Sequence, residues 1–159
     1  MHPIYRKTAG KPGKLVIHDG KTTINRGKTV KPAILCVDDE PIILEVLKHQ
    51  LKDHFGSTMA YEMAQDGEEG LDVIEELTQQ GTKIVVIVSD WMMPGMNGGE
   101  FLEKVYQRFP DTGLIILTGH ADEATLQKTL QQIPIKQCMS KPWTEEQLIV
   151  AVKSAMDKP

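Results

Sequence analysis

The fold is decided by the stretch Ile87-Val88-Ser89-Asp90-Trp91-Met92-Met93-Pro94-Gly95-Met96-Asn97-Gly98. A run of β-branched residues, 84–88, leads into Asp90, and a Pro/Gly-rich loop follows before a helical pattern begins near Gly99. A strand that is apolar on both faces is typical of the middle of a parallel sheet. Asp90 is therefore expected at the carboxyl end of a central strand, where open α/β sheets bind their ligands. A single such Asp is weak evidence, since many strand-terminal Asp residues only cap the next turn or helix.

Strand-like and helical segments alternate after residue 32. Five βα units with short connections predict a doubly wound parallel sheet joined by right-handed crossovers. The predicted strands are Ala33–Val37, Thr58–Ala64, 84–90, Leu114–Leu117 and Ile135–Ser140. The predicted helices run from Pro41 to about His54, from Asp66 through Leu77, from near Gly99 to Phe109, across Leu126 and Leu130, and from the cap Thr144 to Met156.

The polarity of the strands indicates their places in the sheet. The first, third and fourth strands are the most apolar and are expected in the middle, with the mixed second and fifth strands at the edges. This agrees with the flavodoxin-like α/β fold, a five-stranded parallel sheet of order 2-1-3-4-5 with helices on both faces. The full order is taken from that known fold, because polarity alone separates only central strands from edge strands.

The 159 residues fit one domain of ordinary size with a tail. No apolar run approaches the roughly 18 residues of a membrane span, and the basic N-terminus lacks the apolar region of a signal peptide. We therefore expect a cytoplasmic protein without a membrane partner. The two cysteines, Cys36 and Cys138, lie in apolar strand-like runs without metal-ligand spacing and are predicted to be buried free thiols.

The N-terminal segment is strongly basic. Residues 1–31 carry a net charge of +7 and the remaining chain −11, which places a boundary near Pro32 and separates an extension or linker, 1–31, from a domain, 32–158. Within the extension, Lys14–His18, Asp19-Gly20 and Lys21–Ile24 have the form of a two-residue hairpin. The extension is either a solvated linker, the favoured interpretation, or an electrostatic arm for nucleic acid or an acidic partner. The linker is favoured because the extension lacks an aromatic-interleaved or helical nucleic-acid motif, and we do not expect the domain itself to bind nucleic acid.

Polar residues remain at four of the five strand ends. Asp38 and Asp39 follow the first strand, Asp90 the third, Thr118 the fourth and Lys141 the fifth. In a doubly wound sheet these residues point into one crevice. Crowded carboxylates repel unless a cation neutralises them, and oxygen ligands suit Mg²⁺ better than Zn²⁺. Asp90 could then act as a nucleophile that forms an aspartyl phosphate. The Thr118 hydroxyl and the Lys141 ammonium would contact the phosphoryl oxygens.

The region from about Lys31 to Lys158 resembles the response-regulator receiver domains of two-component signalling, including the bacterial chemotaxis regulator. Four motifs match in order and spacing: Val37-Asp38-Asp39-Glu40-Pro41, Ser89 to Gly98, Leu117-Thr118-Gly119 and Ser140-Lys141-Pro142-Trp143. The resemblance implies a Mg²⁺ site made by Asp38, Asp39, Asp90 and the main-chain carbonyl of Met92. It also implies phosphorylation of Asp90 by a histidine kinase or phosphotransfer protein, contacts of Thr118 and Lys141 with the phosphoryl group, and a cis Lys141-Pro142 peptide.

Two positions bear on switching and dephosphorylation. Family members usually place Tyr or Phe three residues before the Lys, where this chain has Cys138, so the chain lacks the aromatic ring whose movement accompanies that of Thr in the family. His120, two residues after Thr118, lies at a position that in the family modulates dephosphorylation; an exposed loop histidine is an equal alternative.

We expect a phosphorylation-controlled switch that catalyses only its own phosphorylation and dephosphorylation, and not an enzyme with a separate substrate. Its effector would bind the face formed by the fourth helix, fifth strand and fifth helix. The alternative is a module of the same fold that signals without phosphorylation, through the basic extension or the Cys138 face. A phosphatase of the haloacid-dehalogenase type is a third alternative, but Met92 replaces its usual second Asp. The cognate kinase, the output, a homodimer and a larger parent protein are left open by the sequence.

Overall fold

The computed structural model describes residues 14–18, 21–25, 30–119 and 123–157. The chain divides into two compact units, Met1–Val30 and Lys31–Pro159. In the first unit, β1 (Lys14–His18) pairs antiparallel with β2 (Lys21–Asn25), and Lys14 lies opposite Asn25. The pairing is that of the expected hairpin; its predicted turn, Asp19-Gly20, is outside the described residues.

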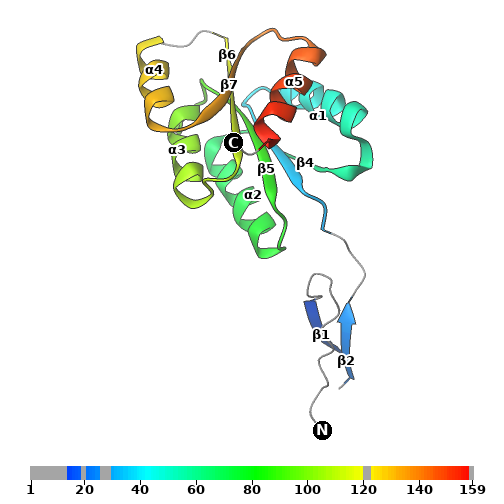
Figure 1. The fold of residues 1–159 in the computed structure, drawn as a ribbon. Helices are drawn as coiled ribbons and strands as arrows, with labels where there is room; N and C mark the ends of the chain where they lie inside the picture. Colours follow the sequence, from blue (N-terminus) through cyan, green and yellow to red (C-terminus); the bar gives the residue numbers. More distant parts are fainter. Residues whose placement is uncertain (1–13, 19–20, 26–29, 120–122, 158–159) are drawn as a thin grey trace. The chain divides into compact units, whose positions relative to one another are not determined.

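The second unit is a five-stranded parallel sheet with helices on both faces (Figure 1). The strand order β4-β3-β5-β6-β7 confirms the predicted order 2-1-3-4-5, since β3 is the first strand of this sheet. The strands are β3 (Ala33–Val37), β4 (Ala60–Ala64), β5 (Ile84–Asp90), β6 (Gly113–Thr118) and β7 (Ile135–Ser140). The helices are α1 (Pro41–Phe55), α2 (Gly67–Gln79), α3 (Gly98–Arg108), α4 (Glu123–Gln132) and α5 (Glu145–Met156).

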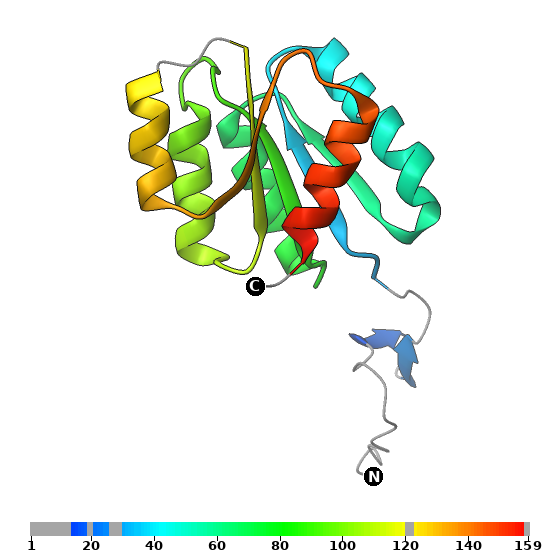
Figure 2. The same ribbon diagram turned by 45° about the horizontal axis from the view of Figure 1, so that its top comes forward.

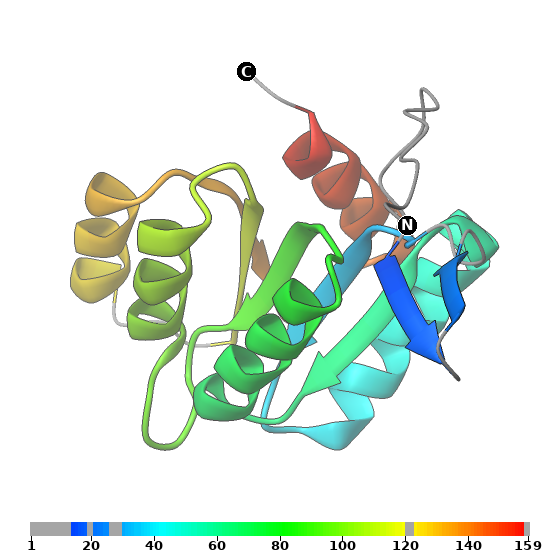
Figure 3. The ribbon, with the colours of Figure 1, turned by 90° about the horizontal axis from the view of Figure 1, so that it is seen from below.

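The two faces of the sheet carry separate hydrophobic clusters. Helices α2, α3 and α4 cover one face, and α1 and α5 cover the other (Figures 2 and 3). Along β3, Leu35 and Val37 pack into the first cluster, while Ile34 and Cys36 pack into the second. The alternation follows from the two-residue period of a strand and explains why the central strands are apolar throughout.

Two predictions about local structure are wrong. The second strand begins at Ala60 and not at Thr58. Helix α1 ends at Phe55 with Gly56 as its C-cap, at a positive φ of 59°, and a short 3₁₀ helix, η1 (Gly56–Thr58), takes up the next residues. Cys138 is exposed, whereas Cys36 is buried as expected. The difference arises because β7 is an edge strand on which only Met139 is buried.

The last helix begins as the sequence predicts. Thr144 caps α5: its hydroxyl accepts a hydrogen bond from the Gln147 backbone, and the Gln147 side chain accepts one from the Thr144 backbone. Within the described ranges, no helix combines the length and the apolar character that crossing a lipid bilayer requires.

Candidate functional site

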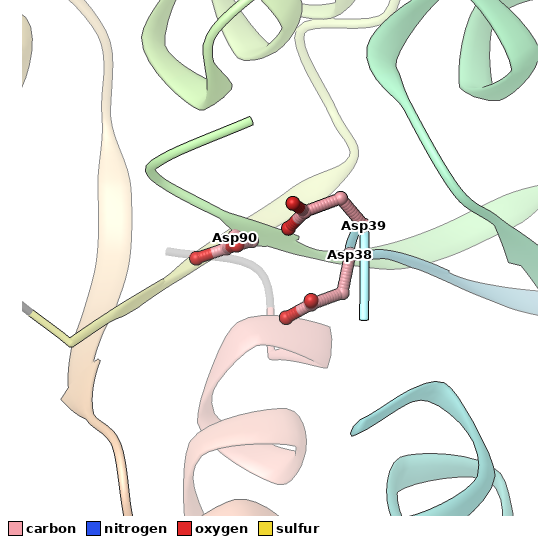
Figure 4. Close-up of side chains that lie close together, drawn as sticks. All are labelled: Asp38, Asp39 and Asp90. Carbon is pink, nitrogen blue, oxygen red and sulfur yellow. The ribbon is translucent and has the colours of Figure 1, made fainter. Parts of the chain in front are cut away.

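Three carboxylates meet at the carboxyl ends of the neighbouring inner strands β3 and β5 (Figure 4). Asp38 and Asp39 follow β3 directly, and Asp90 is the last residue of β5. Their ligand oxygens lie within 4.8 Å of one another. Asp38 and Asp90 are buried, at 0% and 4% exposure, while Asp39 is exposed. The acidic pocket, defined by these three residues, is thus closed on the sheet side and open to solvent at Asp39.

The strand register brings the acids together. Val37 of β3 lies opposite Ser89 of β5, so that Asp38 and Asp90 follow at the same edge of the sheet. The Asp38 backbone amide donates to Ala64 of β4, at 3.1 Å, and its Oδ1 accepts the Glu40 amide at 2.9 Å. This local bond turns the chain away from the sheet and into α1, so one oxygen of Asp38 shapes the loop and the other faces the pocket.

Lys141 supplies positive charge to the acidic pocket. Its Nζ lies 2.8 Å from Asp38 Oδ2, 3.3 Å from Asp90 Oδ1 and 3.8 Å from Glu40 Oε1. Burial raises the pKa of Asp90 to about 6, and the Asp38 carboxylate adds to the rise, while Lys141 opposes it. Burial lowers the pKa of Lys141, but Asp38 and Asp90 outweigh that effect and leave it raised. One ammonium therefore does not neutralise the pocket, which retains excess negative charge.

Thr118 is the last residue of β6 and stands opposite Ser140 of β7. Its backbone carbonyl accepts the amide of Lys141 at 2.9 Å, which links the two strand ends. Its Oγ1 is buried and has no hydrogen-bond partner within the part of the chain that the structure describes. A buried hydroxyl without a partner is unfavourable, so this group is available to a ligand that brings an acceptor oxygen.

Two residues that pack against the Asp90 backbone carbonyl were not predicted from the sequence. The Ser89 hydroxyl is buried and donates to the Asp90 carbonyl at 3.0 Å. Gly98, the first residue of α3, packs so closely that a Cβ there would overlap the Asp90 carbonyl oxygen. The signal for Gly98 was its place after the helix cap Asn97, which accepts the Glu100 amide; the close approach itself depends on distant packing.

The remaining predicted site residues lie in the loop after β5, in a separate pocket or outside the described residues. The Met92 side chain is exposed in the loop after β5, and the role of its carbonyl as a metal ligand stays a prediction. Cys138 lines a separate pocket of about 340 Å³ with Gln147 and Val150 of α5. His120 is outside the described residues, so its role also stays a prediction.

The donor set of the acidic pocket fits a hard divalent cation. Carboxylate oxygens are preferred by Mg²⁺, which keeps several waters and so suits a site open on the Asp39 side. The excess negative charge of Asp38, Asp39 and Asp90 favours such an ion for electrostatic reasons as well. The Lys141 ammonium contacts the Asp90 carboxylate, and the neighbouring strand β6 ends in Thr118, whose hydroxyl has no partner among the described residues. A carboxylate, an ammonium and a free hydroxyl at neighbouring strand ends are groups that can bind and stabilise an anionic phosphoryl group.

Comparison with known proteins finds similar sequences and folds. A family model described as the response regulator receiver domain matches residues 34–153. The chemotaxis protein CheY1 of Helicobacter pylori is 30% identical over 118 residues, which cover 72% of this chain and 89% of CheY1. A CheY-like receiver domain protein from Methanospirillum hungatei has a solved structure with a TM-score of 0.69 and 28% identity, covering 80% of this chain and 94% of that one. A receiver domain protein from Clostridium thermocellum gives a TM-score of 0.68 at 29% identity, with coverage of 79% and 94%.

Several relatives are much longer than this chain. The hydrogenase transcriptional regulatory protein HoxA of Bradyrhizobium diazoefficiens is 30% identical over 128 residues, which are 80% of this chain and 24% of HoxA. The hybrid signal transduction histidine kinase D of Dictyostelium discoideum is also 30% identical over 128 residues, 79% of this chain and 8% of the kinase. The chain therefore spans a quarter or less of these two relatives.

Proposed function

This chain is a member of the response regulator receiver domain family, and from that membership we propose that it is a phosphoacceptor switch of two-component signalling. In this proposal Asp90 accepts a phosphoryl group from a histidine kinase or phosphotransfer protein. The observation that carries the proposal is the convergence of Asp38, Asp39, Asp90 and Lys141 at the end of the sheet where β6 also ends, in Thr118. The domain catalyses its own phosphorylation and dephosphorylation and acts on no other substrate.

The transfer step follows from the chemistry of these side chains. An Asp90 carboxylate oxygen attacks the phosphorus of the donor; the new O–P bond forms as the bond to the donor breaks, and the donor keeps that electron pair. Lys141 leaves part of its contact with Asp90 for a phosphoryl oxygen, and Thr118 donates its hydroxyl to another. Asp38, Asp39, Asp90 and the Met92 carbonyl would hold Mg²⁺. When bound, that ion offsets the negative charge of the carboxylates and of the incoming phosphoryl group.

The proposed partner surfaces follow from the same model. The donor is a phosphohistidine protein, and the effector binds the face made by α4, β7 and α5. Five of the six residues of β7 are at least partly exposed, which leaves that face open to a partner. Phosphorylation at Asp90 would shift a two-state equilibrium on this face.

One observation favours a second function, a module that signals without phosphorylation. Cys138 stands where the family usually has Tyr or Phe, and its side chain is exposed, so no aromatic ring at this position can follow the movement of Thr118. The set Asp38, Asp39, Asp90, Thr118 and Lys141 is nevertheless intact, which supports the phosphoacceptor switch over this alternative.

Intact mass after incubation with Mg²⁺ and acetyl phosphate tests the proposal. We expect a labile, Mg²⁺-dependent adduct of about 80 Da on the protein and none on Asp90→Asn, because the amide is not a nucleophile for phosphorus. Asp72→Asn, which removes an exposed carboxylate of α2, is the matched control and should be labelled like the parent protein. Equal labelling of Asp90→Asn contradicts the assignment of the nucleophile, and no adduct on the folded parent protein favours the second function.

A further inference from the structure

The loop that carries Lys141 is attached to a weakly covered edge of the sheet. On β7 only Met139 is buried, and the strand has a hydrogen-bonded neighbour, β6, on one side. The bond from the Lys141 amide to the Thr118 carbonyl closes this pairing. Apolar burial along β7 itself is therefore slight, and contacts made by the loop after the strand contribute to the position of Lys141.

The Lys141 side chain has alternatives to the position that it occupies. Besides Asp38 and Asp90, its ammonium lies 3.8 Å from Glu40, whose side chain is 60% exposed. A pocket of about 450 Å³ opens beside it, lined by Glu40, Ile43, Pro142 and Trp143 among others. Lysine has a long flexible stem, and this pocket gives it room to turn from Asp90 toward Glu40. Accurate placement thus requires that the backbone of the loop be held.

A polar contact from α1 holds that loop two residues further on. The Trp143 indole Nε1 donates to Gln50 Oε1 at 2.9 Å, across 93 residues of sequence, and the ring packs against the hydrophobic cluster of α1 and α5. Thr144 then begins α5 with its capping box. Gln50 stands on the helix that starts immediately after Asp38, Asp39 and Glu40, so the bond ties the loop of the cation to the element that follows the acids.

We infer that the hydrogen bond between Trp143 and Gln50 keeps the Lys141 ammonium on Asp90, which makes Gln50 and Trp143 positioning residues for phosphoryl transfer. The inference rests on the proposed function. Neither residue touches the acidic pocket: each acts through the backbone of the loop. Loss of the bond allows the loop to separate from α1, and Lys141 then spends more time away from the place where phosphoryl charge develops.

The rate of Mg²⁺-dependent phosphorylation by acetyl phosphate tests this inference. Gln50→Leu removes the acceptor and Trp143→Phe removes the donor while retaining a ring; each should lower the rate by about three- to tenfold, the value of one hydrogen bond. Combining them should give no further loss, since they break the same bond. Gln50→Glu keeps an acceptor oxygen and should retain the rate. Gln107→Leu, on the exposed side of α3, is the matched control. Thermal unfolding verifies that every variant is folded.

Dependence on Lys141 separates positioning from a general effect on the fold. In a Lys141→Ala background the ammonium is absent, so Gln50→Leu should not lower the residual rate further. An equal fall in both backgrounds, or parental rates in Gln50→Leu and Trp143→Phe, overturns the inference.

A second measurement does not require phosphorylation. Amine acetylation followed by mass spectrometry reports the accessibility of Lys141, whose side chain is 16% exposed, relative to the exposed Lys104 of α3. The ratio of Lys141 to Lys104 modification should rise in Gln50→Leu and Trp143→Phe, and an unchanged ratio overturns the inference. If the parent protein takes up no phosphoryl group but this ratio rises, the proposed function fails while the role of the bond in holding Lys141 stands.

Discussion

Strands β5 and β7 both lead into the acidic pocket, but they are held in opposite ways. Six of the seven residues of β5 are buried, against one of the six on β7. Asp90 at the end of β5 is thus fixed by the core, with Ser89 and Gly98 packed behind it. Lys141 at the end of β7 is placed by hydrogen bonds and ion pairs, which rearrange when a charge is added or removed. The comparison teaches that the proposed nucleophile is held by the core, whereas the ammonium beside it is held by polar contacts.

The largest expected effect is a difference in the free energy of unfolding between a substitution in β5 and one in β7. Ile87→Ala in β5 creates a cavity at a fully buried position and should lower the free energy of unfolding by about 2 to 5 kcal/mol. Cys138→Ala in β7 removes an exposed side chain and should change it by less than about 0.5 kcal/mol. Urea unfolding monitored by circular dichroism gives both values. Similar losses in the two variants would mean that the strands are held alike.

The next effect concerns the burial of Asp90. Its pKa of about 6 is above its ordinary value of 3.8, so between these values the folded state binds more protons than the unfolded state. The free energy of unfolding therefore falls as the pH rises through this window, and the loss persists above it. Asp90→Asn has no such loss and, without metal, should be more stable than the parent protein by on the order of 2 kcal/mol above pH 6.

Urea unfolding in EDTA at about pH 8 and about pH 4 measures this difference, which should shrink at the lower pH as Asp90 becomes protonated in the folded state. Asp72→Asn on the exposed side of α2 is the control and should show no comparable gain. A less stable Asp90→Asn at about pH 8 would contradict the view that Asp90 is held in an unfavourable environment.

A smaller effect is expected from the metal. Mg²⁺ at ten times its Kd should raise the free energy of unfolding by about 1.4 kcal/mol at neutral pH, because it binds the folded state. The gain should decrease below pH 6, where protons compete for Asp90. Thermal melts with Mg²⁺ or EDTA measure it, and Asp38→Asn should reduce it. A gain independent of pH and of Asp38 would place the ion elsewhere.

The smallest expected effect concerns the polar contacts that follow β7, at the start of α5. Thr144→Ala removes the capping box of α5 and should lower the free energy of unfolding by about 1 kcal/mol, a typical value for an N-cap. Thr144→Ser retains the hydroxyl and should recover most of the loss. If both substitutions are neutral in urea unfolding, polar contacts at this end of the sheet contribute less than we conclude.

Much of the fold could be predicted because the central strands carry a strong local signal. The β-branched run before Asp90 and the two-sided burial that it indicates set the middle of the sheet, and the predicted limits of β5 and β7 agree with the structure. The start of β4 was missed since Gly56 ends α1 in a left-handed conformation and a turn of 3₁₀ helix takes up Thr58. Burial of Cys138 was wrongly predicted because polarity along β7 did not reveal which of its faces has a covering helix.

Part of the candidate site could also be predicted from the sequence, for a related reason. Strand-terminal acids in a doubly wound sheet must share an edge, so the meeting of Asp38 and Asp90 follows from topology alone. The contact of Trp143 with Gln50 spans 93 residues and leaves no local pattern. The close packing of Gly98 on the Asp90 backbone likewise depends on the angle at which α3 meets the sheet, which no spacing of residues encodes.

The unequal burial of the two cysteines has a practical consequence. Burial, with the Asp38 carboxylate, raises the pKa of Cys36 to about 12, so its thiol is inert in the folded protein, whereas Cys138 is exposed. A maleimide dye or nitroxide added to the native chain should therefore attach at one position, on the face proposed to meet the effector. The unaltered chain thereby offers a single-site handle for fluorescence or spin-resonance spectroscopy. Modification of the buried Cys36 would report the fraction of molecules whose core has opened to solvent.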